Sequence, residues 1–118
     1  MVDAAGEPAR ELLDRVRALL PGRQVREVRM FGVVALMVDG AMAVAAHKDG
    51  SLLVRIDPVE DARLRENPGA ARAEMGGGRS MGPGWLRVEA SALDGDPALS
   101  VWVDAAKRHL ARRAQRRS

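Results

Sequence analysis

Two Asp-Gly dipeptides, Asp39-Gly40 and Asp49-Gly50, interrupt an apolar stretch in the first half of the sequence. A two-residue hairpin loop needs positive φ angles, which Asp tolerates and Gly adopts without steric cost. The segments around these dipeptides, 33–38, 41–47 and 51–57, carry apolar residues at alternate positions or almost continuously, as strands do. This feature constrains the fold more than any other, because it predicts an antiparallel meander at the centre of the chain.

Helix and turn signals flank the meander on both sides. Leu12 and Val16 lie at helical spacing, and Pro21-Gly22 ends that helix. Pro58 is well placed in the first turn of a short helix, with Asp57 as its N-cap. The predicted elements, in chain order, are a helix over 7–20, strands over 24–31, 33–38, 41–47 and 51–57, a short helix over 58–65, a strand over 85–90 and a helix over 98–115.

This order, α-β-β-β-β-α-β-α, predicts an α+β fold. Strands that follow one another along the chain usually pair, and each helix must bury its apolar face against the resulting sheet. We therefore expect two layers, with an antiparallel sheet of about five strands and flanking helices. At 118 residues the chain has room for one hydrophobic core, so residues 1–118 are predicted to form a single domain.

The stretch 67–84 is rich in glycine and is predicted to be a long irregular connection. Its Gly76-Gly77-Gly78 run has the composition of a phosphate-binding loop. Such a loop needs a strand before it and the start of a helix after it, so that backbone N–H groups converge on the anion. A predicted strand follows the run here, which favours a connector over an anion site.

The sequence excludes several kinds of chemistry. Without cysteine there is no disulfide, no thiolate nucleophile and no cysteine-ligated zinc. His47 and His109 fall on separate predicted elements without an acidic cluster nearby, so we expect no metal and no cofactor. No serine lies in a nucleophile elbow, and we expect neither a catalytic residue nor enzyme activity. The N-terminal segment lacks the pattern of a secretion signal, and Met30 to Val38, the longest apolar run, is too short to span a membrane, which predicts a cytoplasmic location.

The net charge of +3 hides an asymmetry along the chain. After Asp104 the sequence has no acidic residue, so the C-terminal helix end from about residue 107 is strongly basic. Several of its bases recur at i, i+4 and i+8 and form one cationic ridge. Two interpretations stay open: a solvated helix end favoured by the macrodipole, or a ridge that contacts nucleic-acid phosphates. The candidate nucleic-acid-binding residues are Lys107, Arg108, Arg112, Arg113, Arg116 and Arg117.

Methionine takes the place of aromatic residues, since the chain has one Phe and no Tyr. The internal methionines are Met30, Met37, Met42, Met75 and Met81. Methionine fills irregular gaps in a core and equally well lines an adaptable partner surface. We expect the first three in the core, with Met42 on the same strand face as Val44, and we expect Trp85 and Trp102 to be buried against the sheet.

Four motifs carry a family resemblance. They are Met30-Phe31-Gly32, Leu36-Met37-Val38-Asp39-Gly40, Leu53-Val54-Arg55 and Met81-Gly82-Pro83-Gly84-Trp85. Their order and spacing, over roughly residues 10–112, resemble the TfoX N-terminal domain family. The resemblance implies an antiparallel sheet with flanking helices, and a non-catalytic regulatory or protein-interaction domain like the one in the bacterial competence regulator TfoX. It implies a protein partner of unknown identity and transfers no catalytic residue. The alternative function is a nucleic-acid-binding module that acts through the basic C-terminal helix.

A single sheet with helices on one side leaves its other face, or an edge strand, without full cover. The predicted strands 33–38 and 41–46 carry few polar residues with which to face solvent. A symmetric homodimer would cover them, so self-association is a further expectation from the sequence.

Overall fold

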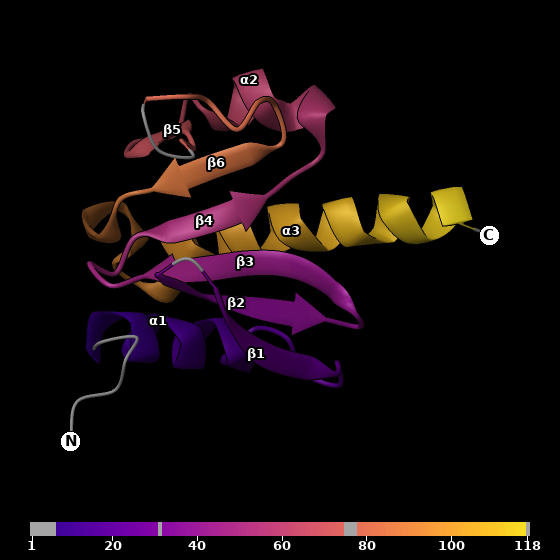
Figure 1. Ribbon diagram of the computed structural model, residues 1–118, viewed down its shortest axis with the longest axis horizontal. Coiled ribbons are helices and arrows are strands. Elements are labelled where there is room, and N and C mark those ends of the chain that lie inside the picture. Colours follow the sequence, from indigo (N-terminus) through magenta and orange to yellow (C-terminus); the bar gives the residue numbers. More distant parts are fainter. Residues whose placement is uncertain (1–6, 31, 75–77, 118) are drawn as a thin grey trace.

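The six-stranded sheet and its helices are shown in a computed structural model that describes residues 7–30, 32–74 and 78–117 (Figure 1). The elements are α1 (Glu7–Ala18), β1 (Val25–Met30), β2 (Val33–Val38), β3 (Ala41–His47), β4 (Leu52–Arg55), η1 (Pro58–Glu60), α2 (Asp61–Leu64), β5 (Ala70–Arg72), β6 (Trp85–Val88), η2 (Ala90–Leu93) and α3 (Asp96–Arg117). Phe31, Met75 and most of the Gly76-Gly77-Gly78 run lie outside the described residues.

The strand order is β1-β2-β3-β4-β6-β5, and every neighbouring pair is antiparallel. The predicted α+β fold is therefore confirmed, with one strand more than expected. The prediction missed β5, which has only three residues and lies within the stretch assigned to an irregular connection. Pairing with β6 makes this segment a strand, and a hydrogen bond from the Glu89 N–H to the Gly69 carbonyl extends the pairing by one step.

The two Asp-Gly turns are confirmed, but they differ in type. Asp39 and Gly40 both have positive φ, 50° and 87°, as a tight two-residue hairpin between β2 and β3 requires. In the second turn only Gly50 has a positive φ, while the Asp49 carboxylate accepts hydrogen bonds from the backbone N–H and the hydroxyl of Ser51. The local residues thus determine both turns, one through backbone angles and the other through a side-chain cap.

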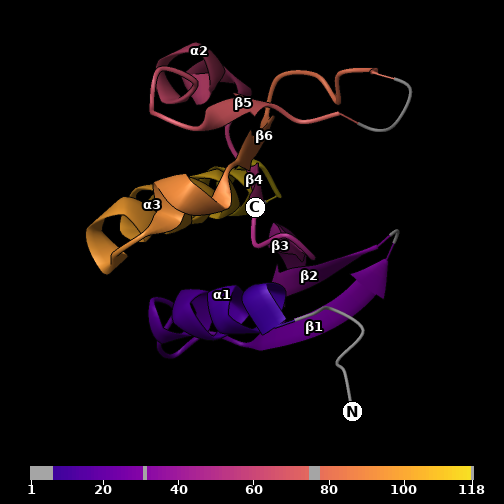
Figure 2. The same ribbon diagram turned by 90° about the vertical axis from the view of Figure 1, so that its left-hand side faces the viewer.

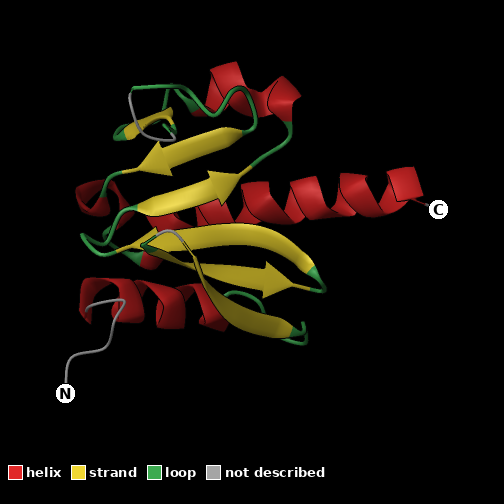
Figure 3. Cartoon of the chain, in the orientation of Figure 1, coloured by secondary structure: helices red, strands yellow, loops and turns green. Residues whose placement is uncertain are grey.

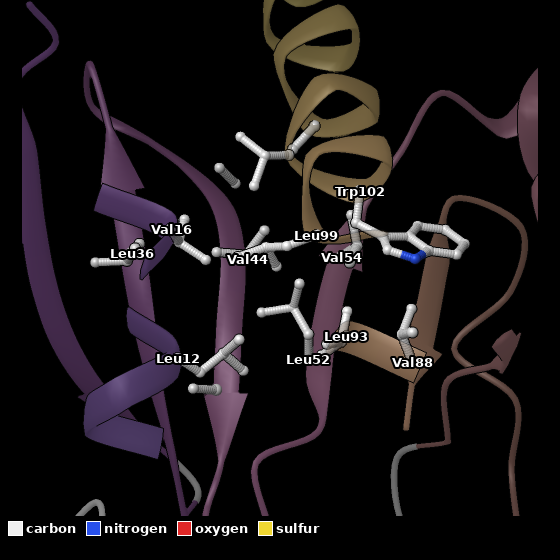
Figure 4. Packing of buried hydrophobic residues seen from close by; sticks show 14 of the residues in the cluster. Leu12, Val16, Leu36, Val44, Leu52, Val54, Val88, Leu93, Leu99 and Trp102 are labelled. Carbon is white, nitrogen blue, oxygen red and sulfur yellow. The ribbon is translucent and has the colours of Figure 1, made fainter. Parts of the chain in front are cut away.

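All described helices lie on one side of the sheet (Figures 2 and 3). Leu12 and Val16 of α1 and Leu99 and Trp102 of α3 point toward the strands, where they meet side chains such as Val44 of β3 (Figure 4). These residues are fully or almost fully buried, which confirms the predicted burial of Trp102. This helix-covered side holds the main hydrophobic core. No described helix is both long enough and apolar enough to cross a membrane.

The alternation of β3 is broken by a bulge. Leu36 pairs with Val44, but Met37 pairs with Met42, so Ala43 is an extra residue on β3. The prediction that Met42 shares a face with Val44 is therefore wrong: Val44 belongs to the helix-covered core, whereas Met42 packs on the opposite face. A one-residue insertion moves the next side chain to the other side of a pleated strand.

A buried carboxylate fastens the β5 end of the sheet. Asp61 begins α2 and is only 3% exposed. It accepts hydrogen bonds from the Arg65 side chain (2.7 Å), the Arg72 side chain (3.4 Å) and the Gly84 backbone N–H (3.2 Å). In turn the Gly84 carbonyl accepts from the backbone N–H of Ile56 (2.9 Å). Asp61 therefore links α2, β5 and the residues that lead into β6.

Candidate interaction surface

The face of the sheet away from the helices has a second, smaller apolar cluster. Ala35, Ala45, Leu53 and Ala73 form its floor and are between 0% and 8% exposed, although no described helix covers them. Longer side chains that surround these small residues provide the cover. Partly buried side chains of Met30, Val33, Met42, Met81 and Trp85 pack against the floor. We call these nine residues, together with Met37, the open face.

The methionines that the structure describes lie on the open face instead of in the main core. Met30, Met37 and Met42 were predicted as core residues, but each remains partly exposed. Met81, from the connection before β6, packs on the same cluster. Strand parity, together with the bulge in β3, places these side chains outside the main core. Four methionines with flexible, polarisable side chains therefore share one partly exposed surface.

Basic side chains border the open face. Arg26 of β1 is exposed, and together with Met37 it lines a hollow of about 530 Å³ at the β1–β2 edge. Arg55 of β4 lies over the ring of Trp85, 4.6 Å from the ring centre, in a cation–π contact. Trp85 is thus only partly buried, unlike Trp102.

A further basic residue on this side, Arg87, is already paired. Arg87 of β6 donates to the Asp49 carboxylate (2.9 Å) and to the Ser51 hydroxyl (3.0 Å). The hydrogen bonds from Ser51 and the charge of Arg87 hold the pKa of Asp49 below its ordinary value, although partial burial opposes this. Asp49 therefore stays ionised and keeps Arg87 neutralised at neutral pH.

The structure separates the six predicted nucleic-acid-binding residues into different environments. Arg108 donates to both oxygens of Glu60, at 2.8 Å from one nitrogen and 3.1 Å from another. Arg112 lies 3.0 Å from a carboxylate oxygen of Asp57, which is 4% exposed. Arg108 therefore joins α3 to the η1 segment through hydrogen bonds, whereas Arg112 pairs with Asp57 by charge alone, because that carboxylate oxygen has no hydrogen-bond partner among the described residues. Lys107 is 4.0 Å from Asp104 one turn earlier in α3.

The remaining candidates point elsewhere. Arg113 is half-buried and lines a hollow of about 190 Å³ together with Arg23, which precedes β1, and Asp39 of the β2–β3 turn. Arg116 is exposed, and Arg117 ends α3 with a side chain outside the described part. In Figure 1 the last turns of α3 extend past the ends of the strands. The six bases thus share one helix without forming one free cationic ridge.

The ion pair of Arg108 with Glu60 alters the ionisation of both groups. Hydrogen bonds from Arg108 lower the pKa of Glu60 below its ordinary value, against the opposing effect of burial, and the charges of Arg108 and Arg63 contribute to the lowering. The pKa of Arg108 is raised by the same pair. Both groups therefore stay ionised around neutral pH. Arg108, which the sequence assigned to phosphates or solvent, is neutralised by Glu60 instead.

His109 is also placed differently from the sequence-based expectation. It is 5% exposed on the inner side of α3, and its Nδ1 has no hydrogen-bond partner among the described residues. Burial, followed by the charges of Arg55 and Arg116, lowers its pKa, so it is uncharged at neutral pH. His47 lies apart on β3, with a pKa lowered by burial and by Arg87. Within 7–30, 32–74 and 78–117 no three His, Cys, Asp or Glu residues form a group that could hold a metal.

If the C-terminal helix binds duplex DNA, its salt dependence is expected to be shallower than six phosphate contacts would give. Arg108 and Arg112 are paired with carboxylates outside the helix, which leaves at most four of the six bases for phosphates. At about −0.9 per contact, log affinity against log salt should fall with a slope no steeper than about −3.6. Fluorescence anisotropy over a salt series measures this slope.

Two variants distinguish the bases that are available to phosphates from those that are paired within the protein. Replacing Arg113 and Arg116 by Ala should flatten the slope by about 2, whereas Arg108→Ala should leave it unchanged. A slope of about −5 for the unaltered chain, or one that responds equally to Arg108→Ala, would contradict the assignment of Arg108 and Arg112 to intramolecular pairs.

Fold and surface together define a class: a two-layer α+β domain with one sheet face covered by helices and the other left partly open. A family model described as the TfoX N-terminal domain matches residues 17–110, most of the chain. The chain therefore belongs to the TfoX N-terminal domain family, as the four sequence motifs predicted. The curated proteins and the solved structures give no significant match.

Proposed function

We propose that this chain is a non-catalytic regulatory domain that acts by binding a partner protein on the open face. The observation that carries the proposal is the cluster of partly exposed methionines and Trp85 around the small floor residues Ala35 and Ala45. A contiguous, partly exposed apolar surface on a small domain is typical of a protein interaction site. The domain acts in the bacterial cytoplasm, in the competence-related regulation with which the family is associated.

The pairing of the buried carboxylates with arginines supports a non-catalytic role. Asp57, Glu60 and Asp61 are the most buried carboxylates of the described chain, and each is paired with an arginine. A general acid or base needs a pKa close to the working pH, which burial or a neighbouring like charge would provide. Here the pKa values of Glu60 and Asp61 are lowered instead, so these two carboxylates act as structural anchors.

Photo-crosslinking in the native cell tests the interaction. A benzoylphenylalanine introduced at Met42 should form a covalent adduct, because the side chain lies on the open face. The same group at Val101, an exposed apolar position of α3 (42% exposed), should form none. The mass of the adduct identifies the occupant: about twice 12.7 kDa indicates the homodimer expected from the sequence, and any other mass indicates a different protein. Equal adducts at both positions, or none at Met42, would contradict the proposal.

A further inference from the structure

The strand residues that point away from the helices, on the side of the sheet that carries the open face, show a simple charge pattern. Register places Arg26 of β1 opposite Met37 of β2, and Arg55 of β4 opposite Trp85 of β6. Between these two arginines lie β2 and β3, whose outward side chains are apolar except for His47 at one end. With neighbouring strands about 4.8 Å apart, β1 and β4 lie roughly 14 Å from each other, so the backbone positions of the two arginines flank the apolar strip on opposite sides.

No carboxylate occupies an outward position of the described strands. Glu27, the acidic residue of β1, points to the helix-covered side and pairs with Arg10 and Arg17 of α1. Asp49, in the turn after β3, is held by Arg87 and Ser51. The strip over β2 and β3 is therefore apolar and flanked by Arg26 and Arg55. Acidic residues lie farther out, beside β5 and β6, where Asp49, Glu74 and Glu89 line a hollow together with Ala71 and Arg87.

This pattern selects among the occupants that could cover the surface. A second copy placed face to face would bring its own Arg26 and Arg55 onto described strands that carry no outward carboxylate, and unpaired charges at an interface are costly. A nucleic acid would pair with the arginines but leave the methionines uncovered. An occupant with an apolar stripe and acidic margins satisfies both parts of the surface.

We propose that the open face binds an amphipathic helix of a partner protein whose apolar stripe is flanked by Asp or Glu residues. This inference rests on the proposed function and adds the chemistry of the partner. The helix lies along β2 and β3, as α1 and α3 lie along the strands on the opposite side (Figures 1 and 2). Its acidic flanks meet Arg26 on one side and Arg55 on the other.

The floor and rim suit such a helix. Ala35 and Ala45 at the centre are small and let a packed helix approach closely, while the surrounding methionines can adopt new rotamers to fit its side chains. Strands β2 and β3 contain 6 and 7 residues. They span about 20–23 Å, which matches a helix of roughly 14 residues.

The test compares two labelled helical peptides of equal length that share one leucine stripe and carry either Glu or Lys on both flanks. Fluorescence anisotropy with the full chain measures their affinities at low and high salt. The Glu peptide should bind at least about tenfold more tightly at low salt, and the ratio should shrink as salt screens the flanking charges. Equal affinities, tighter binding of the Lys peptide, or binding of neither would overturn the inference.

Reversing the charges of the two arginines tests whether they cause the preference for the Glu peptide. Arg26→Glu with Arg55→Glu should invert the preference, so that the Lys peptide binds more tightly. Arg113→Glu with Arg116→Glu makes the same change in net charge on α3 and should leave the preference intact. If both double variants lose it equally, overall charge is the cause and the inference fails. Should Arg55→Glu prevent folding, Arg26→Glu alone must lower the Glu-to-Lys affinity ratio at least threefold.

The outcomes separate this inference from the proposed function. An adduct at Met42 with a partner of another mass, combined with tighter binding of the Lys peptide, would retain an interaction domain and overturn the acidic partner. An adduct at twice the mass of the chain would make a second copy the occupant and overturn the helix proposal. No adduct at Met42 and no peptide binding would overturn both.

Discussion

Asp61→Ala is expected to lower the free energy of unfolding by about 3 kcal/mol, because it leaves two arginines and the Gly84 N–H without their shared acceptor. This lies at the lower end of the ~3–5 kcal/mol range for broken buried pairs. The reason is that the side chains of Arg65 and Arg72 are 40% and 43% exposed, so water can solvate them once Asp61 is removed. Asp61→Asn keeps an acceptor for Gly84 and should cost less.

Urea unfolding followed by circular dichroism measures the loss, and a thermal melt should show a decrease in Tm of about 10–15 °C. Asp104→Ala is the matched control, since Asp104 is 60% exposed and lies 4.0 Å from Lys107. Its removal should change stability by less than about 0.5 kcal/mol. Similar losses for the two variants would show that the Asp61 network does not hold the β5 end of the sheet.

The same variant has a defined pH dependence. Burial opposes ionisation of Asp61, but hydrogen bonds from Arg65 and Gly84 and the charge of Arg72 outweigh it and hold the pKa below the ordinary value of 3.8. A carboxyl group with a lowered folded-state pKa stabilises fully above its unfolded pKa and loses this contribution as the pH falls through the folded value. The stability difference between wild type and Asp61→Ala should therefore be constant near pH 7 and shrink as the pH is lowered below about 4. A difference that stays constant below that pH would assign the loss to packing alone.

Trp102→Ala should reduce the free energy of unfolding by about 3–5 kcal/mol, the range for a large aromatic truncated in a well-packed core. Trp102 is 2% exposed and lies between α3 and the helix-covered face of the sheet (Figure 4). Its removal leaves a cavity that the surrounding leucine and valine side chains can fill only in part. Chemical unfolding followed by far-ultraviolet circular dichroism measures the change.

Trp85→Ala is the internal control, because the chain has only these two tryptophans. Trp85 is partly exposed on the open face, so its loss should cost about 1–2 kcal/mol, including the cation–π contact with Arg55. The tryptophan fluorescence of the Trp85→Ala variant then comes from Trp102 and should be blue-shifted relative to that of Trp102→Ala. The opposite order of stabilities, or of emission wavelengths, would contradict the assignment of the two faces.

The sequence predicted the elements whose determinants are local. The Asp39-Gly40 hairpin follows from the φ angles that these two residues accept, and the start of η1 follows from Asp57, whose side chain accepts from the Val59 N–H. β5 escaped prediction because three residues between Gly69 and Ala73 carry no pattern of their own. Only pairing with β6 distinguishes them from the connection that follows.

For the candidate site too, the sequence predicted some features and the tertiary structure decided others. Sequence spacing placed six bases on one helix and Met30, Met37 and Met42 on predicted strands, and those placements depend only on helical and strand periodicity. Tertiary structure decided what these residues meet. Arg108 is neutralised by Glu60, 48 residues earlier in the chain, and one bulge at Ala43 moves Met42 to the open face. The φ angles of a turn are set by the residues within it, but an ion pair or an uncovered face depends on which distant segments pack together. The sequence by itself therefore determined the hairpins and helices of this protein, whereas only the tertiary structure decided that Arg108 of the basic helix pairs with Glu60 and that the described methionines lie on the open face.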